Sequence, residues 1–439
     1  MRNPRGEGRP LTRAFAMRIR REEGRASTRA RSSASSESAM APTFERLTED
    51  LHLEILSRVP AKSLCRFKCA SKNWLRLVDH ADHSTRLPKS MAGFFCNSTI
   101  SDDDDDDEGF PGSALHFVDA SAGSGAPFIY PSSSAILPDR RRLHLLDCCN
   151  GLLLCRRYDD VSTTTQDDYD FITFTYVVCN PATEEWAVLP DRVQDDKVVG
   201  TACLGFDPAA APHFHVFLFS LDARRFISGV DVYSSQTGTW TYKVKRRGET
   251  LRLADHQSAV FLNGYLHLST ACAQRYPSIL AVDTKGEEWR YFDTPCDMHG
   301  GDEFLGSIHQ SQGRLHYASF NTTGDWDEVQ IQLQVYALDD YATDEWILKH
   351  TLELSETDVH GGIIERKFDW IEMHPESNLI FFCEESDSTL KCYSMRSQEE
   401  TELRTLGEGQ PPYLPYVPLY SSLESLRIGH QDETADKFI

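Results

Sequence analysis

The spacing of hydrophobic positions changes once along the chain, near residue 90. Between residues 47 and 78, apolar side chains recur every three or four positions, which predicts short amphipathic helices. From residue 94 to residue 425, short β-rich apolar runs alternate with Gly, Asn and Pro, and no long amphipathic helix is visible. The pattern therefore predicts a small helical module followed by a large all-β domain.

Three short helices are expected in the helical module. Thr48 is placed to cap the first helix, which Pro60 ends, and Ser63 and Ser71 are placed to begin the next two. A core this small is marginal alone, so part of its apolar surface is expected to bind a partner. The apolar side chains on these helical faces are Leu51, Ile55, Leu56, Val59, Leu64, Phe67, Trp74, Leu75 and Val78.

One phrase recurs in the β-rich region, in which a polar turn follows an apolar strand and ends at a tryptophan. The four tryptophans, at steps of 54, 49 and 57 residues, are Trp186, Trp240, Trp289 and Trp346. A fifth copy without a tryptophan follows near Tyr393. Asn-Gly or Gln-Gly pairs precede strands at residues 150–151, 263–264 and 312–313, and Asn-Gly is typical of tight hairpins because both residues need a positive φ.

A period near 50 residues is typical of kelch-type propeller blades and longer than the period of WD40 blades. Each tryptophan is expected to be a buried wedge between neighbouring blades. Five periods are visible, and residues 94–130 together with a C-terminal strand at 413–420 would supply a sixth blade that closes the ring. We predict a propeller of six kelch-like blades, with five or seven as alternatives. An open array of β-sandwiches explains the periodic tryptophans less well.

Composition narrows the classes of function. The 439 residues carry a formal net charge of −22, which disfavours nucleic acid as the main partner because phosphate binding needs a basic face. No apolar run approaches the roughly 18 residues that would span a bilayer. Twelve cysteines without any Cys-x-x-Cys pair are expected to be reduced, buried thiols. We expect a soluble protein of the nucleus or cytoplasm, with no metal, no cofactor and no membrane contact.

Two segments stand apart by their charge. Residues 1–43 hold ten Arg, no Lys and four Glu, which is typical of a disordered basic leader, of an upstream extension before Met40, of an organellar transit peptide or, as the weakest alternative, of a basic arm for nucleic acid. The first two interpretations are preferred because a compact module begins shortly after Met40. The unbroken acidic run at residues 102–108 is expected to be a solvated loop.

The helical module resembles the F-box of plant F-box proteins. The match runs through residues 49–50, 54–60, 62–64, 66–69 and 71–74, although Thr48 stands where the family usually has proline after leucine. The resemblance implies docking on a Skp-family adaptor and, through it, on a cullin. The side chains expected to contact the adaptor are Leu47, Leu51, Ile55, Leu56, Val59, Pro60, Leu64 and Trp74.

The β-rich region resembles the F-box-associated domain that follows plant F-boxes. The matching phrases, in the family's order, are at residues 148–154, 178–190, 205–208, 230–240 and 261–265. In the family this domain is thought to select the target. The expected organisation is a leader at 1–43, an F-box at 44–90, a propeller at 91–425 and a tail at 426–439.

We therefore expect the substrate-recognition subunit of a Skp–cullin–F-box ubiquitin ligase, which acts by proximity and has no catalytic residue of its own. Target contacts are expected in irregular loops at one mouth of the propeller, because strands are committed to packing. The candidate loops are residues 222–226, 274–277, 298–303 and 322–327, and the candidate side chains are Arg224, Arg225, Tyr276 and Trp326.

Two other functions compete with this interpretation. A kelch-like propeller enzyme or glycan-binding protein would share the fold, but the P-loop, zinc-protease, nucleophile-elbow and dinucleotide-binding signatures are absent. His213 and His215 lie near Cys203 on a predicted strand, yet no further ligand is spaced to complete a metal site. An F-box protein that acts outside any ligase would have the same sequence features.

Overall fold

The computed structural model of the chain describes residues 47–56, 72, 74, 77, 91–99, 113–120, 143–158, 174–192, 198–245, 250–253, 259–272, 278–295, 306–323, 330–354, 359–360, 363–364, 368–384, 389–406 and 409–427. The basic leader and the acidic run at 102–108 lie outside these residues. No helix within the described ranges is long and apolar enough to cross a membrane.

The N-terminal module contributes one continuous described helix, α1 (Glu49–Leu56), and single helical residues at Lys72, Trp74 and Leu77. Thr48 precedes α1, and Asp50 in its first turn places negative charge where the helix dipole favours it. The second and third helices expected from the sequence fall largely outside the described residues, so the three-helix arrangement stays a prediction.

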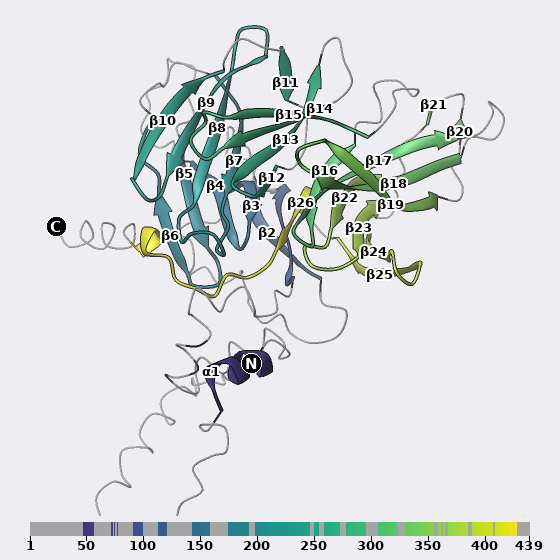
Figure 1. Cartoon of the computed structure of the whole chain (residues 1–439), viewed down its shortest axis with the longest axis horizontal. Coiled ribbons are helices and arrows are strands. Elements are labelled where there is room, and N and C mark those ends of the chain that lie inside the picture. Colours follow the sequence, from purple (N-terminus) through teal and green to yellow (C-terminus); the bar gives the residue numbers. More distant parts are fainter. Residues whose placement is uncertain are drawn as a thin grey trace, which may run out of the picture. The chain divides into compact units, whose positions relative to one another are not determined.

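Antiparallel sheets form a six-bladed propeller (Figure 1). Blade 1 consists of β3 (Leu143–Cys149), β4 (Leu152–Tyr158), β5 (Phe174–Asn180) and β6 (Glu185–Val188). Blade 2 consists of β7 (Val199–Gly205), β8 (His215–Leu221), β9 (Ile227–Ser234) and β10 (Thr239–Val244). Blade 3 consists of β11 (Leu251–Leu253), β12 (Val260–Leu262), β13 (Tyr265–Cys272), β14 (Ser278–Asp283) and β15 (Trp289–Asp293).

The next two blades repeat this order. Blade 4 consists of β16 (Ser307–Ser311), β17 (Arg314–Thr323), β18 (Gln330–Asp340) and β19 (Glu345–Leu354). Blade 5 consists of β22 (Phe368–Met373), β23 (Leu379–Glu384), β24 (Thr389–Ser394) and β25 (Glu399–Thr405). A separate short hairpin between these two blades is formed by β20 (Val359–His360) and β21 (Ile363–Ile364).

The closing blade joins the two ends of the β-rich region. Its middle strand, β1 (Gly93–Thr99), pairs antiparallel with β2 (Ser113–Asp119) on one side and with β26 (Gly409–Tyr416) on the other. The prediction of six blades is therefore confirmed, as is the sixth blade built from both ends of this region. The innermost strands contact one another in the order β26, β3, β7, β12, β16, β22 and back to β26.

Tight turns join the first two strands of several blades. Asn150 and Gly151 have φ of 47° and 89°, Asn263 and Gly264 have 53° and 79°, and Gln312 and Gly313 have 50° and 70°. Two positive φ values are what a two-residue hairpin turn requires, so the prediction made from these pairs is confirmed.

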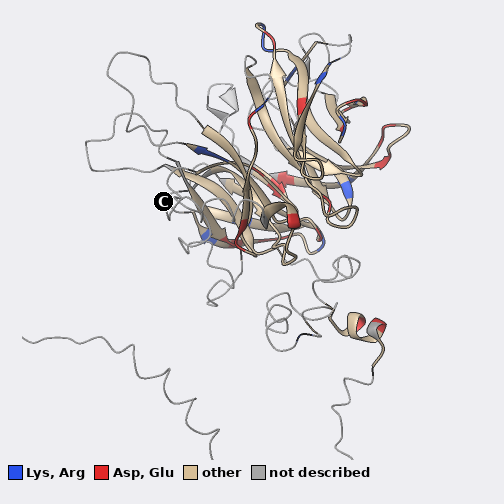
Figure 2. Ribbon diagram, turned by 90° about the vertical axis from the view of Figure 1, so that its left-hand side faces the viewer, with Lys and Arg blue, Asp and Glu red and all other residues tan. Residues whose placement is uncertain are grey.

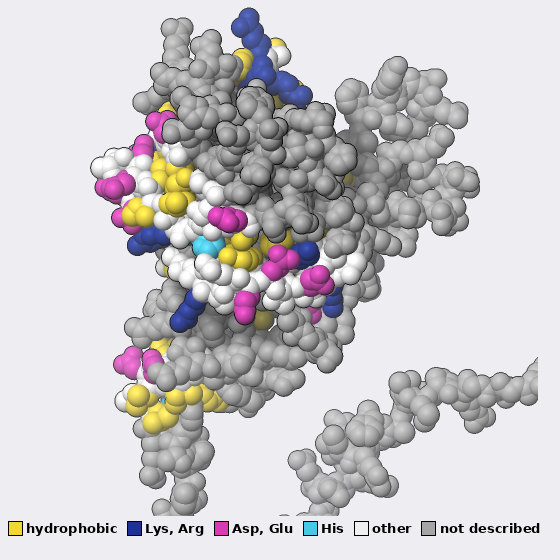
Figure 3. All heavy atoms as spheres, turned by 90° about the vertical axis from the view of Figure 1, so that its right-hand side faces the viewer, with side chains coloured by type: hydrophobic (Ala, Val, Ile, Leu, Met, Phe, Trp, Pro, Cys, Tyr) yellow, Lys and Arg dark blue, Asp and Glu magenta, His cyan; other side chains and the backbone are white. Residues whose placement is uncertain are grey.

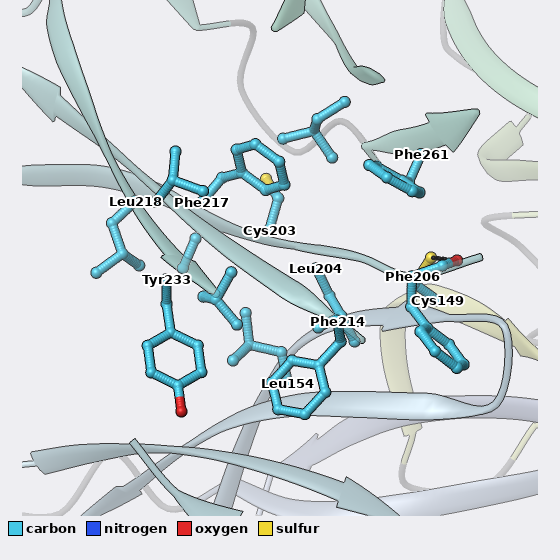
Figure 4. Packing of buried hydrophobic residues seen from close by; sticks show 14 of the residues in the cluster. Cys149, Leu154, Cys203, Leu204, Phe206, Phe214, Phe217, Leu218, Tyr233 and Phe261 are labelled. Atoms are coloured by element: carbon cyan, nitrogen blue, oxygen red, sulfur yellow. Dashed lines mark hydrogen bonds between the residues drawn. The ribbon is translucent and has the colours of Figure 1, made fainter. Parts of the chain in front are cut away.

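Apolar clusters fill the spaces between neighbouring blades. The largest spans blades 1, 2 and 3 and includes Leu154, Leu204, Phe217 and Phe261 (Figure 4). Four further clusters occupy the remaining blade interfaces around the ring. Eight cysteines with described side chains are free thiols and six of them are buried, in agreement with the sequence prediction for these positions.

The periodic tryptophans each contact the blade that precedes their own. Trp186 is buried, at 4% exposure, in the cluster between the closing blade and blade 1. Trp240 Nε1 donates a hydrogen bond to the Pro190 carbonyl of blade 1 at 2.7 Å, and Trp346 Nε1 donates to the Asp293 carbonyl of blade 3 at 2.9 Å. Trp289 in blade 3 meets Phe219 of blade 2 edge to face.

The prediction that all four tryptophans are buried wedges is wrong in part. Trp240, Trp289 and Trp346 are only half-buried. They lie on or beside the fourth strand of their blades, and blades diverge toward the outside of a ring, so these indoles are covered on one side only. They join neighbouring blades through surface hydrogen bonds and ring contacts in place of full burial.

A C-terminal segment, residues 417–427, packs along blade 1 (Figure 1). It ends in the short helix α5 (Glu424–Arg427), and it places Leu419, Leu423 and Leu426 in the largest apolar cluster. Asn180 Nδ2 donates to the Leu419 carbonyl at 2.9 Å, and the Glu185 carboxylate accepts from the Leu423 N–H at 3.2 Å. Leu426 is buried in this cluster, so the packing of the propeller continues beyond residue 425, the boundary predicted from the sequence.

The Gly151→Ala and Gly264→Ala substitutions test how tightly this segment is held. Both residues have positive φ, so a new Cβ strains both backbones similarly, but only at position 151 would it lie 2.6 Å from Leu419. We expect Gly151→Ala to lower the free energy of unfolding by about 1–3 kcal/mol more than Gly264→Ala, as overpacking does. Urea unfolding of the two variants measures this, and equal losses would contradict the packing described here.

Trp186→Ala and Trp240→Ala test the unequal burial of the tryptophans. Loss of the buried Trp186 should cost about 3–5 kcal/mol of stability. Trp240→Ala should cost clearly less because its indole is partly exposed and loses mainly one hydrogen bond, which contributes about 1 kcal/mol. Denaturant unfolding followed by circular dichroism compares them, and a larger loss at Trp240 would show that the outer contacts dominate.

Candidate binding surfaces

Helix α1 has one inward and one outward apolar face. Leu53 and Leu56 are buried, at 3% and 0% exposure, whereas Leu51 and Ile55 are 49% and 40% exposed. Leu51 and Ile55 are four positions apart, so they lie one above the other on the same face of the helix. This exposed Leu51–Ile55 strip is the apolar surface that the helical pattern predicted.

The remaining predicted adaptor contacts divide into three groups. Leu47 is half-buried, and Trp74 is half-buried with its ring edge toward His52 at a centroid distance of 5.8 Å. Leu56 faces inward, which corrects its assignment to the binding surface: adjacent helical residues are 100° apart, so Ile55 and Leu56 cannot share a narrow face. The predicted contacts outside the described residues are Val59, Pro60 and Leu64.

The propeller has two ends with different connections. In an antiparallel four-stranded blade, the turns between strands 1 and 2 and between strands 3 and 4 lie at one end, which we call the turn end. The loops between strands 2 and 3 and the connections to the next blade lie at the other end, the loop end. The strands that flank all four candidate target loops terminate at the loop end. Tyr276 and Trp326 themselves are outside the described residues.

The described candidate loop, residues 222–226 between β8 and β9, is closed by its own hydrogen bonds. Asp222 Oδ1 accepts from the N–H groups of Arg224 and Phe226, each at 2.9 Å. The Arg225 N–H donates to the Asp222 carbonyl at 2.9 Å, and Arg225 has a φ of 63°. Asp222 therefore fixes the backbone of the loop while the Arg224 and Arg225 side chains remain exposed.

Blade 3 adds another cation beside this loop. The Arg252 guanidinium on β11 lies over the Phe226 ring, 4.9 Å from its centroid. A guanidinium over an aromatic face is attracted by the ring quadrupole, so this contact holds Arg252 against the 222–226 loop. No sequence pattern indicates this pairing, because 26 positions separate Phe226 from Arg252 and the contact crosses between blades.

An axial cavity of about 100 Å³, which was not predicted from the sequence, lies among the innermost strands. Its lining includes Asp147 of β3, Gln310 of β16, Glu372 of β22 and Pro415 of β26. A carboxylate directly after apolar residues of a strand is the signal that could have pointed to it, since Asp147 follows Leu145 and Leu146, and Glu372 follows Trp370 and Ile371.

The two axial carboxylates connect neighbouring innermost strands. Asp147 Oδ2 accepts from the Leu204 N–H of β7 at 2.7 Å, and Glu372 Oε1 lies 2.8 Å from His309 Nδ1 of β16. Burial raises the pKa of Asp147 to about 7, with the charge of Glu372 acting in the same direction and backbone N–H groups opposing it. These carboxylates already have partners in the protein, which fits a structural role at the axis.

The histidine pair weighed as a metal site has no supporting cluster. Burial lowers the pKa of His215 to about 4, and the nearby His213 acts in the same direction. Across the ranges that the structure describes, no group of three or more His, Cys, Asp and Glu side chains could hold a metal ion.

Comparison with known families agrees with both halves of the chain. Residues 44–83 match the F-box domain, and residues 120–406 match the F-box associated beta propeller domain. Similar proteins include two F-box proteins of Arabidopsis thaliana. One is 25% identical over 335 residues, 70% of each chain, and the other is 24% identical over 327 residues, 70% of this chain and 79% of the relative.

Solved structures resemble this chain only weakly. An α-L-arabinofuranosidase of Fusarium graminearum aligns with 63% of this chain and 82% of its own, at 10% identity and a TM-score of 0.37. A likeness at this level carries no functional argument. The family matches cover most of the chain, and they agree with the six blades and the helix described above. The chain belongs to the plant F-box proteins that carry a C-terminal F-box associated β-propeller domain.

Proposed function

We propose that this chain is the substrate-recognition subunit of a Skp–cullin–F-box ubiquitin ligase. The observation that carries the proposal is the exposed Leu51–Ile55 strip on α1, within the segment that matches the F-box domain. An apolar strip left uncovered on a short helix gains free energy when a partner covers it. The partner proposed is the Skp-family adaptor, which would connect the chain to a cullin.

The propeller is proposed to hold the target. Its turn end carries two-residue turns in blades 1, 3 and 4, whereas its loop end carries the connections between blades, so the loop end can vary with less disturbance to the blades. Arg224 and Arg225 are exposed on a loop that Asp222 holds in shape, and they are proposed as target contacts. The predicted contacts Tyr276 and Trp326 are proposed on the same argument from sequence and topology.

The chain would bind the target and the adaptor and would supply no catalytic group to the ligase reaction. A receptor subunit raises the effective concentration of its target near the ligase machinery, and this needs no nucleophile or general base of its own. The axial carboxylates, which an enzyme hypothesis would recruit, are engaged in bonds between innermost strands. The proposed setting is the nucleus or cytoplasm, with residues 44–90 for adaptor docking and the propeller from residue 91 for target binding.

Ile55→Asp tests the adaptor contact. A carboxylate placed in an apolar interface would lose hydration without gaining a partner, so we expect capture of the Skp adaptor by the full chain to fall at least tenfold. Quantitative pull-down with purified adaptor measures this. Leu348→Asp is the matched control, since Leu348 is 47% exposed on β19 of the propeller, and its capture should be unchanged.

A second comparison separates binding from folding. Leu56→Ala should lower the melting temperature because Leu56 is fully buried, whereas Ile55→Asp should leave it nearly unchanged. Normal adaptor capture by the folded Ile55→Asp variant would refute the proposed docking face. Capture of the adaptor without any cullin in the complex would instead support an F-box protein that works outside a ligase.

A further inference from the structure

The chain is strongly acidic, and many of its described basic side chains are paired with carboxylates. The formal net charge is −22. The ion pairs between described residues include Arg192–Asp231, Lys243–Glu287, Arg290–Glu288, Arg314–Asp339 and Lys391–Glu400. Basic side chains left without a carboxylate on such a surface are available to an external anion.

Three arginines at the loop end form such a group, which we call the arginine triad: Arg224, Arg225 and Arg252. All three are exposed, and within the described part of the chain no ion pair joins their guanidinium groups to a carboxylate. The neighbouring Asp222 uses Oδ1 to accept two backbone N–H groups of its own loop. Lys and Arg side chains are visible at the top of the molecule in Figure 3, and the loop between β8 and β9 projects toward the same end in Figure 1.

The backbone that carries Arg224 and Arg225 and the guanidinium of Arg252 are held in place before any partner arrives. The loop from 222 to 226 is closed by the bonds from Asp222, and Arg225 is kept at a φ of 63°, which non-glycine residues adopt mainly in such closed turns. Arg252 is positioned by the Phe226 ring at 4.9 Å. A surface that is already ordered loses less conformational entropy on binding, so the triad can bind anions at low entropic cost.

The negative charge on the rest of the propeller surface limits which anions can bind to the arginine triad. Asp and Glu positions occur on strands and loops of several blades in the charge-coloured ribbon (Figure 2), in keeping with the formal net charge of −22. A long polyphosphate would be repelled by this field, since nucleic-acid binding depends on an extended basic face. A short run of carboxylates can meet the three guanidinium groups locally, and the planar guanidinium matches a carboxylate through two parallel hydrogen bonds.

We propose that the arginine triad Arg224, Arg225 and Arg252 binds an Asp/Glu-rich segment of the target protein. The inference rests on the proposed function, because it names the chemistry of the target that the loop end would select. Arg224 and Arg225 belong to blade 2 and Arg252 belongs to blade 3, so the bound segment lies across both blades. Recognition is then electrostatic and depends on salt, with affinity that falls as ionic strength screens the exposed charges.

A fluorescence-polarisation titration of the full chain tests the proposal, with a labelled peptide of six consecutive glutamates between Gly-Ser flanks as the probe. We expect Arg224→Gln/Arg225→Gln to weaken peptide binding at least tenfold and Arg252→Gln to weaken it several-fold. Arg290→Gln/Arg314→Gln is the matched control, because it also removes two positive charges, but from exposed sites that already have carboxylate partners. The peptide affinity of this control should stay within about twofold of that of the original protein.

Three outcomes would overturn the inference. The first is an equal loss of peptide affinity in the test and control variants, which would show that affinity depends on the net charge of the protein and not on the arginine triad. The second is unchanged peptide affinity in both test variants, the single variant Arg252→Gln and the double variant Arg224→Gln/Arg225→Gln. The third is tighter, triad-dependent binding of a single-stranded DNA oligomer of equal charge, which would assign the surface to nucleic acid.

Capture of the Skp adaptor by the same protein preparations keeps the two proposals separate. Peptide binding that is lost in the triad variants while adaptor capture persists supports the inference. Normal peptide binding by a chain that fails to capture the adaptor counts against the ligase function and leaves the triad assignment standing. Because Arg252 lies outside the 222–226 loop, Arg252→Gln remains informative even if the double variant disturbs that loop.

Discussion

The pairing of β1 with β26 is the interaction on which the rest of the propeller depends. It joins residues 93–98 to residues 409–416, and it turns six sheets into a closed ring. Without it, the closing blade would lose its innermost strand, and the apolar clusters on its two sides would lose Leu414 and Tyr416 on one side and Tyr413 on the other. A closed ring leaves only short outer edges, whereas an open array would expose strand edges and apolar faces to other chains.

Closure of the ring brings the six innermost strands together at the axis, where neighbouring strands need stabilising contacts with one another. Asp147 and Glu372 stabilise this region by bonding to a neighbouring innermost strand, Asp147 to the Leu204 N–H of β7 and Glu372 to the His309 ring of β16. Asn97 does the same between β1 and β3, accepting from the Leu145 N–H at 2.8 Å and donating to its carbonyl at 3.1 Å. The C-terminal segment adds a second layer on blade 1, so the seam of the ring is held both at the axis and along its side.

The ring also divides the surface into two ends with separate roles. Short turns with positive φ are fixed by their geometry, and they occupy the turn end. The loop end carries the connections that differ in length and charge, and there a single carboxylate, Asp222, shapes a loop whose arginines face outward. Rigid blades that support an adaptable rim, together with a helix that leaves Leu51 and Ile55 uncovered, suit a protein that joins two partners.

The sequence by itself determined the features that repeat or that act over a few residues. The tryptophan steps indicated the blades, the Asn-Gly pairs indicated the turns, and the pattern around Leu51 and Ile55 indicated an amphipathic helix. Tertiary structure alone decided which side of α1 is buried, the partial exposure of Trp240, the bond from Asp147 to Leu204 and the position of Arg252 over Phe226. The reason is physical: a period or a turn is set by local backbone geometry, whereas burial and contacts between blades depend on how distant segments pack against one another.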